Sequence, residues 1–276
     1  LAGITAGVGH LTKASVLPAL LLAGLCLLLR GLMSFNCRYN VADLDALPSA
    51  KARHLLAHMC YVMVLLSCFL VLVFPYIRTS KERFGHYFYN VNSTFYIWYD
   101  SWDEVERGTK AHGDRRGWPD MPEDQIPSYQ KYVREHSLKS IAGRFSRGLL
   151  RLTTVVISSY GYAELLAAYV IAAALFFGQN YGRTRSILSR TNPCVLVFIV
   201  GYFMGYILLY AWYADIAAGN RFVISLFLPA LLILLSLFSR AQSEKMSFVC
   251  LGRKIPASIT SWFVLFFLFA YLVTVF

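Results

Sequence analysis

Long apolar segments separated by charged connections run along most of the chain. A helix needs about 20 mainly apolar residues to cross the hydrocarbon core of a bilayer. Segments that reach or approach this length occupy residues 16–29, 55–77, 152–182, 191–214, 222–239 and 255–276, and a shorter apolar piece covers residues 1–9. The pattern predicts an all-α polytopic membrane protein with about six transmembrane helices, the first of them partial or broken.

One passage, residues 78–151, is far too charged to lie in hydrocarbon. We call it the hydrophilic loop. It divides the chain into three parts: residues 1–77 hold the first transmembrane helices and a basic connection, the loop follows, and residues 152–276 form a second bundle of transmembrane helices. We therefore look for functional chemistry in and around this loop.

The first half of the hydrophilic loop is predicted to fold against the membrane surface. Its aromatic run, residues 84–102, carries amphipathic Tyr and Trp rings that favour the membrane interface. Asp100 or Ser101 can then cap a short helix that has acidic residues in its first turn and ends at Gly113. Residues 120–124 repeat this pattern and predict another short helix.

The second half of the loop predicts an amphipathic helix over residues 137–152. Leu, Ile and Phe recur on one face at helical spacing, which is typical of a helix that lies along a membrane surface. The basic residues fall away from that face: Lys139, Arg144, Arg147 and Arg151. The loop as a whole is therefore expected to hold several short interfacial helices.

The distribution of basic residues predicts which side of the membrane the loop faces. Alternate connections place eleven basic residues on one face against Asp43, Asp45 and Glu244, which marks that face as cytoplasmic. These basic residues are Arg30, Arg38, Lys51, Arg53, Arg183, Arg185, Arg190, Arg240, Lys245, Arg253 and Lys254. The hydrophilic loop then lies on the external face, because long loops are exempt from the charge rule.

Composition agrees with a membrane protein and excludes other classes. Hydrophobic residues make up 57% of the chain and charged residues 15%, whereas a soluble domain is about a quarter charged. The net charge of +11 lies mainly beside apolar segments, so we expect lipid headgroups and no nucleic acid as its partners. The six cysteines form no CxxC motif and are interpreted as packing residues. No metal or cofactor is predicted.

Two segments resemble the GT-C membrane glycosyltransferases, in particular the glycosyltransferase family 39 and protein mannosyltransferase-like group. Residues 3–25, GITAGVGHLTKASVLPALLLAGL, are similar to the Gly-rich segment of that group that ends in Leu-Thr-Lys. Residues 213–235, YADIAAGNRFVISLFLPALLILL, are similar to a later segment, where an outward turn ends in Arg-Phe and runs into a Pro-containing span. Residues 90–105, NVNSTFYIWYDSWDEV, also look like loops of bacterial members.

The resemblance implies an inverting transfer of a sugar from a polyprenyl-phosphate-linked donor to an acceptor on the external face. It also implies that the catalytic acidic residue lies in a first outer loop. Because the chain opens with Leu1 inside an apolar run, we expect it to be the later part of a longer protein, with that residue upstream. The expected location is a bacterial inner membrane, with the hydrophilic loop periplasmic.

Lys13 and Arg221 are the candidate residues for binding the donor phosphate. Each lies at the predicted external end of an apolar span, beside a helix break or a short turn. An ammonium or a guanidinium there can meet the phosphate that leaves the sugar, and both positions fall in the segments that carry the resemblance. The alternative is that they are interfacial residues that extend their charges to water.

Other residues are candidates for contacts with the acceptor or another substrate. Glu164 lies inside an apolar run, where an ionised carboxylate is costly unless it is paired or faces a cavity. The remaining candidates lie in the hydrophilic loop: Tyr99, Asp100, Asp103 and Glu104. The loop carboxylates could instead hold a cation, and helix capping explains them without any ligand. The loop histidines lack metal-ligand spacing and are interpreted as ordinary: His86, His112 and His136.

A membrane transporter or lipid flippase is the alternative to a transferase, because it also places a few charges among helices. Transporters commonly show paired, broken spans in two related halves. Residues 10–15 break the apolar pattern once, and no second copy of this break occurs in the chain. The large aromatic loop favours an enzyme that acts on a lipid substrate.

Overall fold

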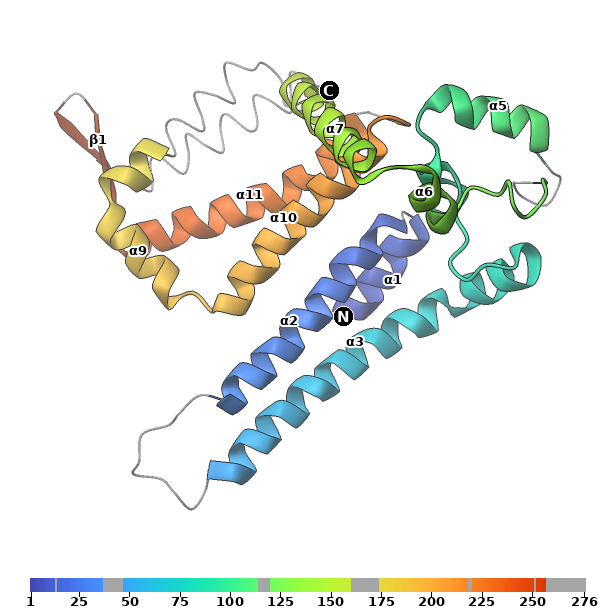
Figure 1. Cartoon of the computed structure of the whole chain (residues 1–276). Helices are drawn as coiled ribbons and strands as arrows, with labels where there is room; N and C mark the ends of the chain where they lie inside the picture. The colour runs from blue at the N-terminus through green and yellow to red at the C-terminus, as the bar shows by residue number, and fades with distance from the viewer. Residues whose placement is uncertain are drawn as a thin grey trace. The chain divides into compact units, whose positions relative to one another are not determined.

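The computed structural model describes residues 1–12, 14–36, 47–113, 120–159, 174–217, 220–250 and 252–256. The chain divides into two compact units. The first unit comprises Leu1–Ile141 and Pro193–Tyr206, and the second comprises Ala142–Asn192 and Ile207–Phe276. Most described residues are helical (Figure 1). The boundary between the units falls within two helices, α7 (Leu138–Ser159) and α10 (Pro193–Tyr213).

Three helices pack together at the start of the first unit: α1 (Ala2–Thr12), α2 (Leu17–Asn36) and α3 (Leu47–Phe84). A 3₁₀ turn at Ala14–Val16 precedes α2, so a break in the helix does separate the first apolar piece from the next. Gly3 and Gly7 allow α1 to approach α3 closely. A Cβ at Gly3 would overlap the carbonyl of Leu65, and one at Gly7 would lie 3.0 Å from the Cβ of Leu72.

The core of this helix group centres on Leu20, Phe69 and Val73, whose side chains are 5% exposed or less. The first part of α10 also packs in the first unit. There the Tyr206 hydroxyl donates a hydrogen bond to the Ser15 carbonyl, and the Cys194 thiol lies 3.7 Å from the sulfur of Met33. Apolar burial and close backbone packing therefore hold this part of the chain together.

Helix α3 is longer than the sequence pattern predicts at both ends. It begins at Leu47, inside the connection predicted to be polar, and continues past Arg78 to Phe84. The hydrophilic loop therefore starts as helix. Pro75 lies inside α3. A charged last turn can extend a helix when its polar side chains point to water, and Arg78 and Glu82 pair at 2.7 Å across one such turn.

Two helices among the described residues are long and apolar enough to cross a membrane. They are Ala52–Phe84 within α3 and Pro193–Tyr213, and Leu17–Met33 is a shorter apolar helix. Only 17% of the most apolar stretch of α3 and 22% of that of α10 is buried. Large apolar side chains such as Met63, Val64 and Val71 are more than 60% exposed. The other predicted spans, and the count of six, stay predictions, since residues 160–173 and 257–276 lie outside the described residues.

The hydrophilic loop folds into short elements with buried residues of its own. These elements are α4 (Val91–Thr94), η2 (Tyr96–Trp98), α5 (Trp102–His112) and α6 (Tyr129–Glu135). Phe95, Val105 and Tyr132 are at most 4% exposed. The short helix predicted over residues 120–124 is wrong: this segment forms turns, and the helix lies farther on at α6, capped by Ser128.

The second unit contains the later part of α7, a helical stretch at residues 174–179, α9 (Tyr181–Arg190), the end of α10, and α11 (Asn220–Ser243). The prediction of an all-α chain is wrong in one place. Strands β1 (Ser247–Cys250) and β2 (Arg253–Pro256) form an antiparallel hairpin where only a basic turn was expected. Gly252 takes a φ of 77°, which suits the tight connection between the strands.

Candidate functional site

The start of α5 fixes two of the predicted loop carboxylates. Ser101 is the N-cap, and its side chain accepts a hydrogen bond from the Glu104 backbone N–H at 3.3 Å. The Glu104 carboxylate in turn accepts one from the Asp100 N–H at 3.0 Å. The predicted cap and the predicted end at Gly113 are therefore confirmed. Asp103 is exposed in the first turn, where negative charge is favourable.

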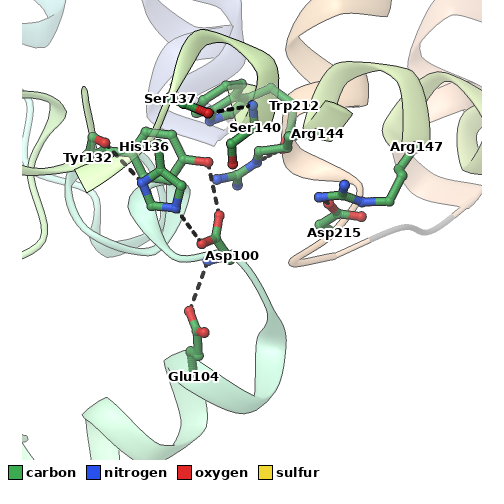
Figure 2. A network of polar contacts seen from close by, with 10 residues as sticks. All are labelled: Asp100, Glu104, Tyr132, His136, Ser137, Ser140, Arg144, Arg147, Trp212 and Asp215. Carbon is green, nitrogen blue, oxygen red and sulfur yellow. Dashed lines mark hydrogen bonds and ion pairs between the residues drawn. The ribbon is translucent and has the colours of Figure 1, made fainter. Parts of the chain in front are cut away.

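Asp100 is held by two side chains, that of Tyr132 in α6 and that of His136 directly after α6 (Figure 2). One carboxylate oxygen accepts a hydrogen bond from the Tyr132 hydroxyl at 2.9 Å. The other lies 2.7 Å from Nε2 of His136. Tyr132 is 3% exposed, and its ring stacks on that of His136 with 3.9 Å between centroids. Asp100 is therefore an oriented carboxylate, and we call these three residues the loop site.

His136 is held in a position that favours its charged form. Its Nδ1 lies 2.9 Å from the Tyr132 carbonyl, so both ring nitrogens face oxygen acceptors, and only an imidazolium can donate to both. Partial burial acts to lower the pKa of His136, but the hydrogen bonds to Asp100 and to the Tyr132 carbonyl outweigh it and raise the pKa overall. The interpretation of His136 as an ordinary loop histidine is therefore wrong.

Tyr99, the residue before Asp100, stays protonated at neutral pH. Burial of its hydroxyl, followed by the nearby charge of Glu104, raises the pKa of Tyr99 to about 12. The phenol can therefore donate a hydrogen bond to a substrate. Among the residues that the structure describes, no group of three or more His, Cys, Asp or Glu is arranged to hold a metal ion.

A second cluster forms in the second unit, where α7 meets the end of α10. The two backbones touch at Gly148, because a Cβ there would overlap the carbonyl oxygen of Ala211 and lie 3.0 Å from its Cα. Gly148 and Leu152 are buried on this face of α7. This close approach brings the basic residues on neighbouring turns of α7 to the residues that follow Ala211.

Arg144 is the most unexpected residue of this cluster. The pattern predicts it on the water-facing side of α7, but it is only 1% exposed, so that prediction is wrong. Its guanidinium carbon lies 4.2 Å from the centre of the Trp212 ring, and its Nε donates to the Trp212 carbonyl at 3.1 Å. Stacking on an aromatic face and a carbonyl partner make burial of a guanidinium tolerable.

Two arginines of α7, Arg147 and Arg151, hold the carboxylate of Asp215. Figure 2 shows Arg147 beside Asp215. Arg147 Nη2 lies 3.4 Å from one oxygen of Asp215, and Arg151 Nη1 lies 3.2 Å from the other. Arg151 also donates to the Ala214 carbonyl at 3.3 Å. The Asp215 side chain is 8% exposed, whereas those of Arg147 and Arg151 are 63% and 57% exposed. We call these residues, with Arg144, the arginine cluster.

The arginine cluster carries more positive than negative charge. Arg147 and Arg151 share one carboxylate, which leaves a local excess of one positive charge. Each guanidinium has five N–H donors, and Asp215 and Ala214 accept only part of those of Arg147 and Arg151. Such planar donors match the geometry of a phosphate, as they do that of a carboxylate, and bind it through two hydrogen bonds at once.

Other predicted site residues fall outside what the structure describes. Lys13 and Glu164 lie outside the described residues, and so does the side chain of Arg221, although its backbone starts α11. The donor-phosphate role of Lys13 and Arg221 stays a prediction. The arginine cluster was missed because the pattern placed Arg144 in water and because Trp212 and Asp215, the partners of these arginines, lie far away in the sequence. Its signal was the spacing of Arg144, Arg147 and Arg151, which puts three guanidinium groups on adjacent turns of one helix.

No protein-family model, curated protein or solved structure matches the chain.

Proposed function

We propose that the chain is part of an integral-membrane glycosyltransferase that moves a sugar from a polyprenyl-phosphate-linked donor to an acceptor on the external face of the membrane. The observation that carries this proposal is the arginine cluster, an excess of fixed guanidinium charge in a chain that is otherwise strongly apolar. The resemblance of residues 3–25 and 213–235 to GT-C glycosyltransferases points to the same substrate class.

A multi-pass membrane location is supported by the exposure of apolar helices. The core helix of a soluble protein is mostly buried, whereas most of the apolar stretch of α3 and of α10 is not. Exposed apolar area of this extent needs a lipid or protein partner. With the basic connections cytoplasmic, the hydrophilic loop is external, and in a bacterial cell it is periplasmic.

The arginine cluster suits the phosphate of a lipid-linked donor. In an inverting transfer, a hydroxyl oxygen of the acceptor attacks the anomeric carbon of the sugar while the bond from that carbon to the phosphate oxygen breaks. The polyprenyl phosphate leaves with the electron pair, and the proton of the hydroxyl goes to a general base. Charge grows on the leaving phosphate, and the free donors of Arg147 and Arg151 stabilise that charge.

The loop site suits recognition of the acceptor. Asp100 is oriented by Tyr132 and His136, and Tyr99 is a neutral donor nearby in the sequence. We assign Tyr99, Asp100 and Glu104 to acceptor binding. Asp103 is an exposed further contact. Sugar and peptide hydroxyls are recognised by carboxylates of this kind, because an ionised carboxylate accepts hydrogen bonds through two oxygens.

Release of polyprenyl phosphate from a polyprenyl-phosphate hexose tests this function. The full-length protein in lipid nanodiscs should release it in the presence of acceptor. Arg147→Gln and Arg151→Gln should each lower turnover by roughly 10², since loss of one such donor weakens transition-state stabilisation by about 2–4 kcal/mol. Arg83→Gln removes an exposed charge at the end of α3 and should leave turnover unchanged.

Two results would refute the proposal. Turnover at the wild-type level in both arginine variants would remove the donor-phosphate role from the arginine cluster. Movement of the intact lipid across the bilayer, without release of polyprenyl phosphate, would instead identify a flippase. Partial recovery in Arg147→Lys would support two-donor binding, because one ammonium cannot reproduce the planar pair of donors.

A further inference from the structure

We propose that a basic surface on the second unit binds the headgroups of anionic phospholipids. The surface is formed by α9, the end of α11 and the β-hairpin, and its basic residues are Arg183, Arg185, Arg190, Arg240, Lys245, Arg253 and Lys254. All seven are exposed. The inference rests on the proposed membrane location and is independent of the proposed reaction.

Hydrogen bonds fix the two halves of this basic surface to each other. The side-chain amide of Gln179 donates to the Val249 carbonyl at 3.2 Å and accepts from the Val249 N–H at 2.9 Å. Asn180 donates to the Ser247 carbonyl, and Arg183 to the Lys245 carbonyl, each at 2.9 Å. The hairpin therefore lies against the start of α9, as Figure 1 shows. Basic residues distant in the sequence thus act as one surface.

The charge of the basic surface is almost uncompensated. Residues 174–192 contain no acidic residue, and residues 240–256 contain only Glu244. Arg190 pairs with Glu244 at 3.2 Å, and their side chains are 73% and 38% exposed. Arg185, Arg253 and Lys254 form no ion pair with any residue that the structure describes. A surface of this charge attracts anions, and repulsion among its own cations falls when anions bind.

The exposed face of α9 mixes apolar and basic side chains in the way that interfacial helices do. Tyr181, Arg185 and Leu188 share one side of the helix, and Tyr181 and Leu188 are 66% and 43% exposed. Ile187 is buried and holds the helix to the unit from another side. Tyr rings and Leu chains enter the boundary between headgroups and acyl chains, while Arg meets the phosphates.

This mixture favours a lipid surface over a nucleic acid or an acidic protein. Polybasic segments beside membrane helices bind anionic headgroups, and each basic residue adds to the attraction. The predicted sidedness also places all seven residues on the cytoplasmic face, where anionic lipids give a negative surface potential. A nucleic acid base could stack on the Tyr181 ring, but a nucleic acid would give no role to the exposed Leu188 side chain beside Arg185.

Lipid binding to the purified full-length protein in neutral detergent tests the proposal. Native mass spectrometry would count phosphatidylglycerol and phosphatidylcholine molecules bound at increasing lipid concentration. Wild type should prefer phosphatidylglycerol. The triple variant Arg185→Gln, Arg253→Gln, Lys254→Gln should bind it at least about tenfold more weakly, with a shallower dependence on salt. The matched control Arg83→Gln, Arg107→Gln, Arg134→Gln removes the same charge from exposed positions of the first unit.

Several results of this experiment would overturn the proposal that the basic surface binds anionic headgroups. Equal loss in both triple variants, or none in either, would overturn the proposal, as would equal binding of the two lipids by wild type. If inorganic phosphate displaced phosphatidylglycerol at an equal concentration, the surface would be a general anion site and the proposal would be overturned. Preference for single-stranded DNA would also overturn it. An unchanged unfolding temperature in lipid-free detergent shows that the variants are folded. Extraction of the wild type by carbonate would instead refute the membrane location.

Discussion

The loop site and the arginine cluster each join an aspartate to basic side chains, but they differ in charge balance and in how the chain builds them. Asp100 meets one histidine and one tyrosine that lie up to 36 positions away in the sequence. Asp215 meets two arginines of a helix up to 68 positions away, beside a third that is fully buried. The first set is balanced when His136 is charged, and the second keeps an excess positive charge.

This difference separates a site that orients one carboxylate from a site that can bind an anion. A balanced, hydrogen-bonded pair can serve mainly to fix the fold of the loop and to orient one carboxylate. Neighbouring guanidinium ions in excess repel one another, and a bound anion lowers that repulsion. We therefore expect changes at the loop site to alter local stability and pH dependence, and changes at the arginine cluster to alter anion binding.

The largest expected effect on stability is at the helix contact that creates the arginine cluster. Gly148→Ala places a methyl group against the backbone of Ala211, and we expect overpacking to lower the stability of the second unit by about 1–3 kcal/mol or more. Gly143→Ala on the same helix meets only Arg147 Nη1 at 3.5 Å, so it should be neutral or slightly stabilising. Unfolding temperatures in detergent measure both. Equal effects would show that the close contact is unimportant.

Replacing Asp215 should change stability and anion binding in opposite directions. Asp215→Asn removes the charge that Arg147 and Arg151 share, so we expect a loss of about 1–3 kcal/mol in stability. The same change raises the excess positive charge, so polyprenyl phosphate should bind more tightly. Glu244→Gln breaks a pair that is exposed on both sides and should cost at most about 1 kcal/mol. Weaker phosphate binding by Asp215→Asn would argue that Asp215 positions the arginines for the ligand.

The cap of α5 gives an intermediate effect confined to the hydrophilic loop. Ser101→Ala removes the acceptor for the Glu104 N–H and should destabilise the loop by about 1 kcal/mol. Hydrogen exchange should rise across α5 and near Asp100, and it should not change in α9. Ser93→Ala, an exposed hydroxyl in α4, is the control. Exchange that rises equally in both variants would show that α5 does not depend on this cap.

The smallest expected effect is the pH dependence of the loop site. Because the folded pKa of His136 is raised, its pairing contributes fully below the unfolded value of about 6.5 and is lost as pH rises through the folded pKa. The pair is partly exposed, so the change should stay below about 1 kcal/mol. NMR titration of His136 in wild type and Asp100→Asn measures it. A His136 pKa that does not fall in Asp100→Asn would contradict the assigned pair.

Sequence patterns predict the local features of this chain better than its long-range contacts. The cap at Ser101 and the end at Gly113 follow from neighbouring residues, and both are confirmed. The start of α3 at Leu47 was missed because its first turns are polar, and tertiary packing rather than local pattern sets such ends. The hairpin near Gly252 was missed because its short strands lie inside a basic connection.

The candidate sites show the same limit. The contact between Asp100 and His136 requires α6, which the pattern did not predict, so His136 looked ordinary. We placed Arg144 on the water-facing side of its helix because every arginine counts as polar in a pattern of hydrophobic and polar positions. Stacking on Trp212 makes its burial favourable, and this partner lies far away in the sequence.

Binding of polyprenyl phosphate to the purified full-length protein tests most directly the claim that the arginine cluster holds a lipid-linked phosphate. The double variant Arg147→Gln, Arg151→Gln should lower the affinity at least about tenfold, because two guanidinium partners of the phosphate are lost. The double variant Arg83→Gln, Arg107→Gln removes the same charge from exposed positions of the first unit and should bind as wild type does. Equal affinities for all three proteins, or equal losses in both variants, would contradict the claim.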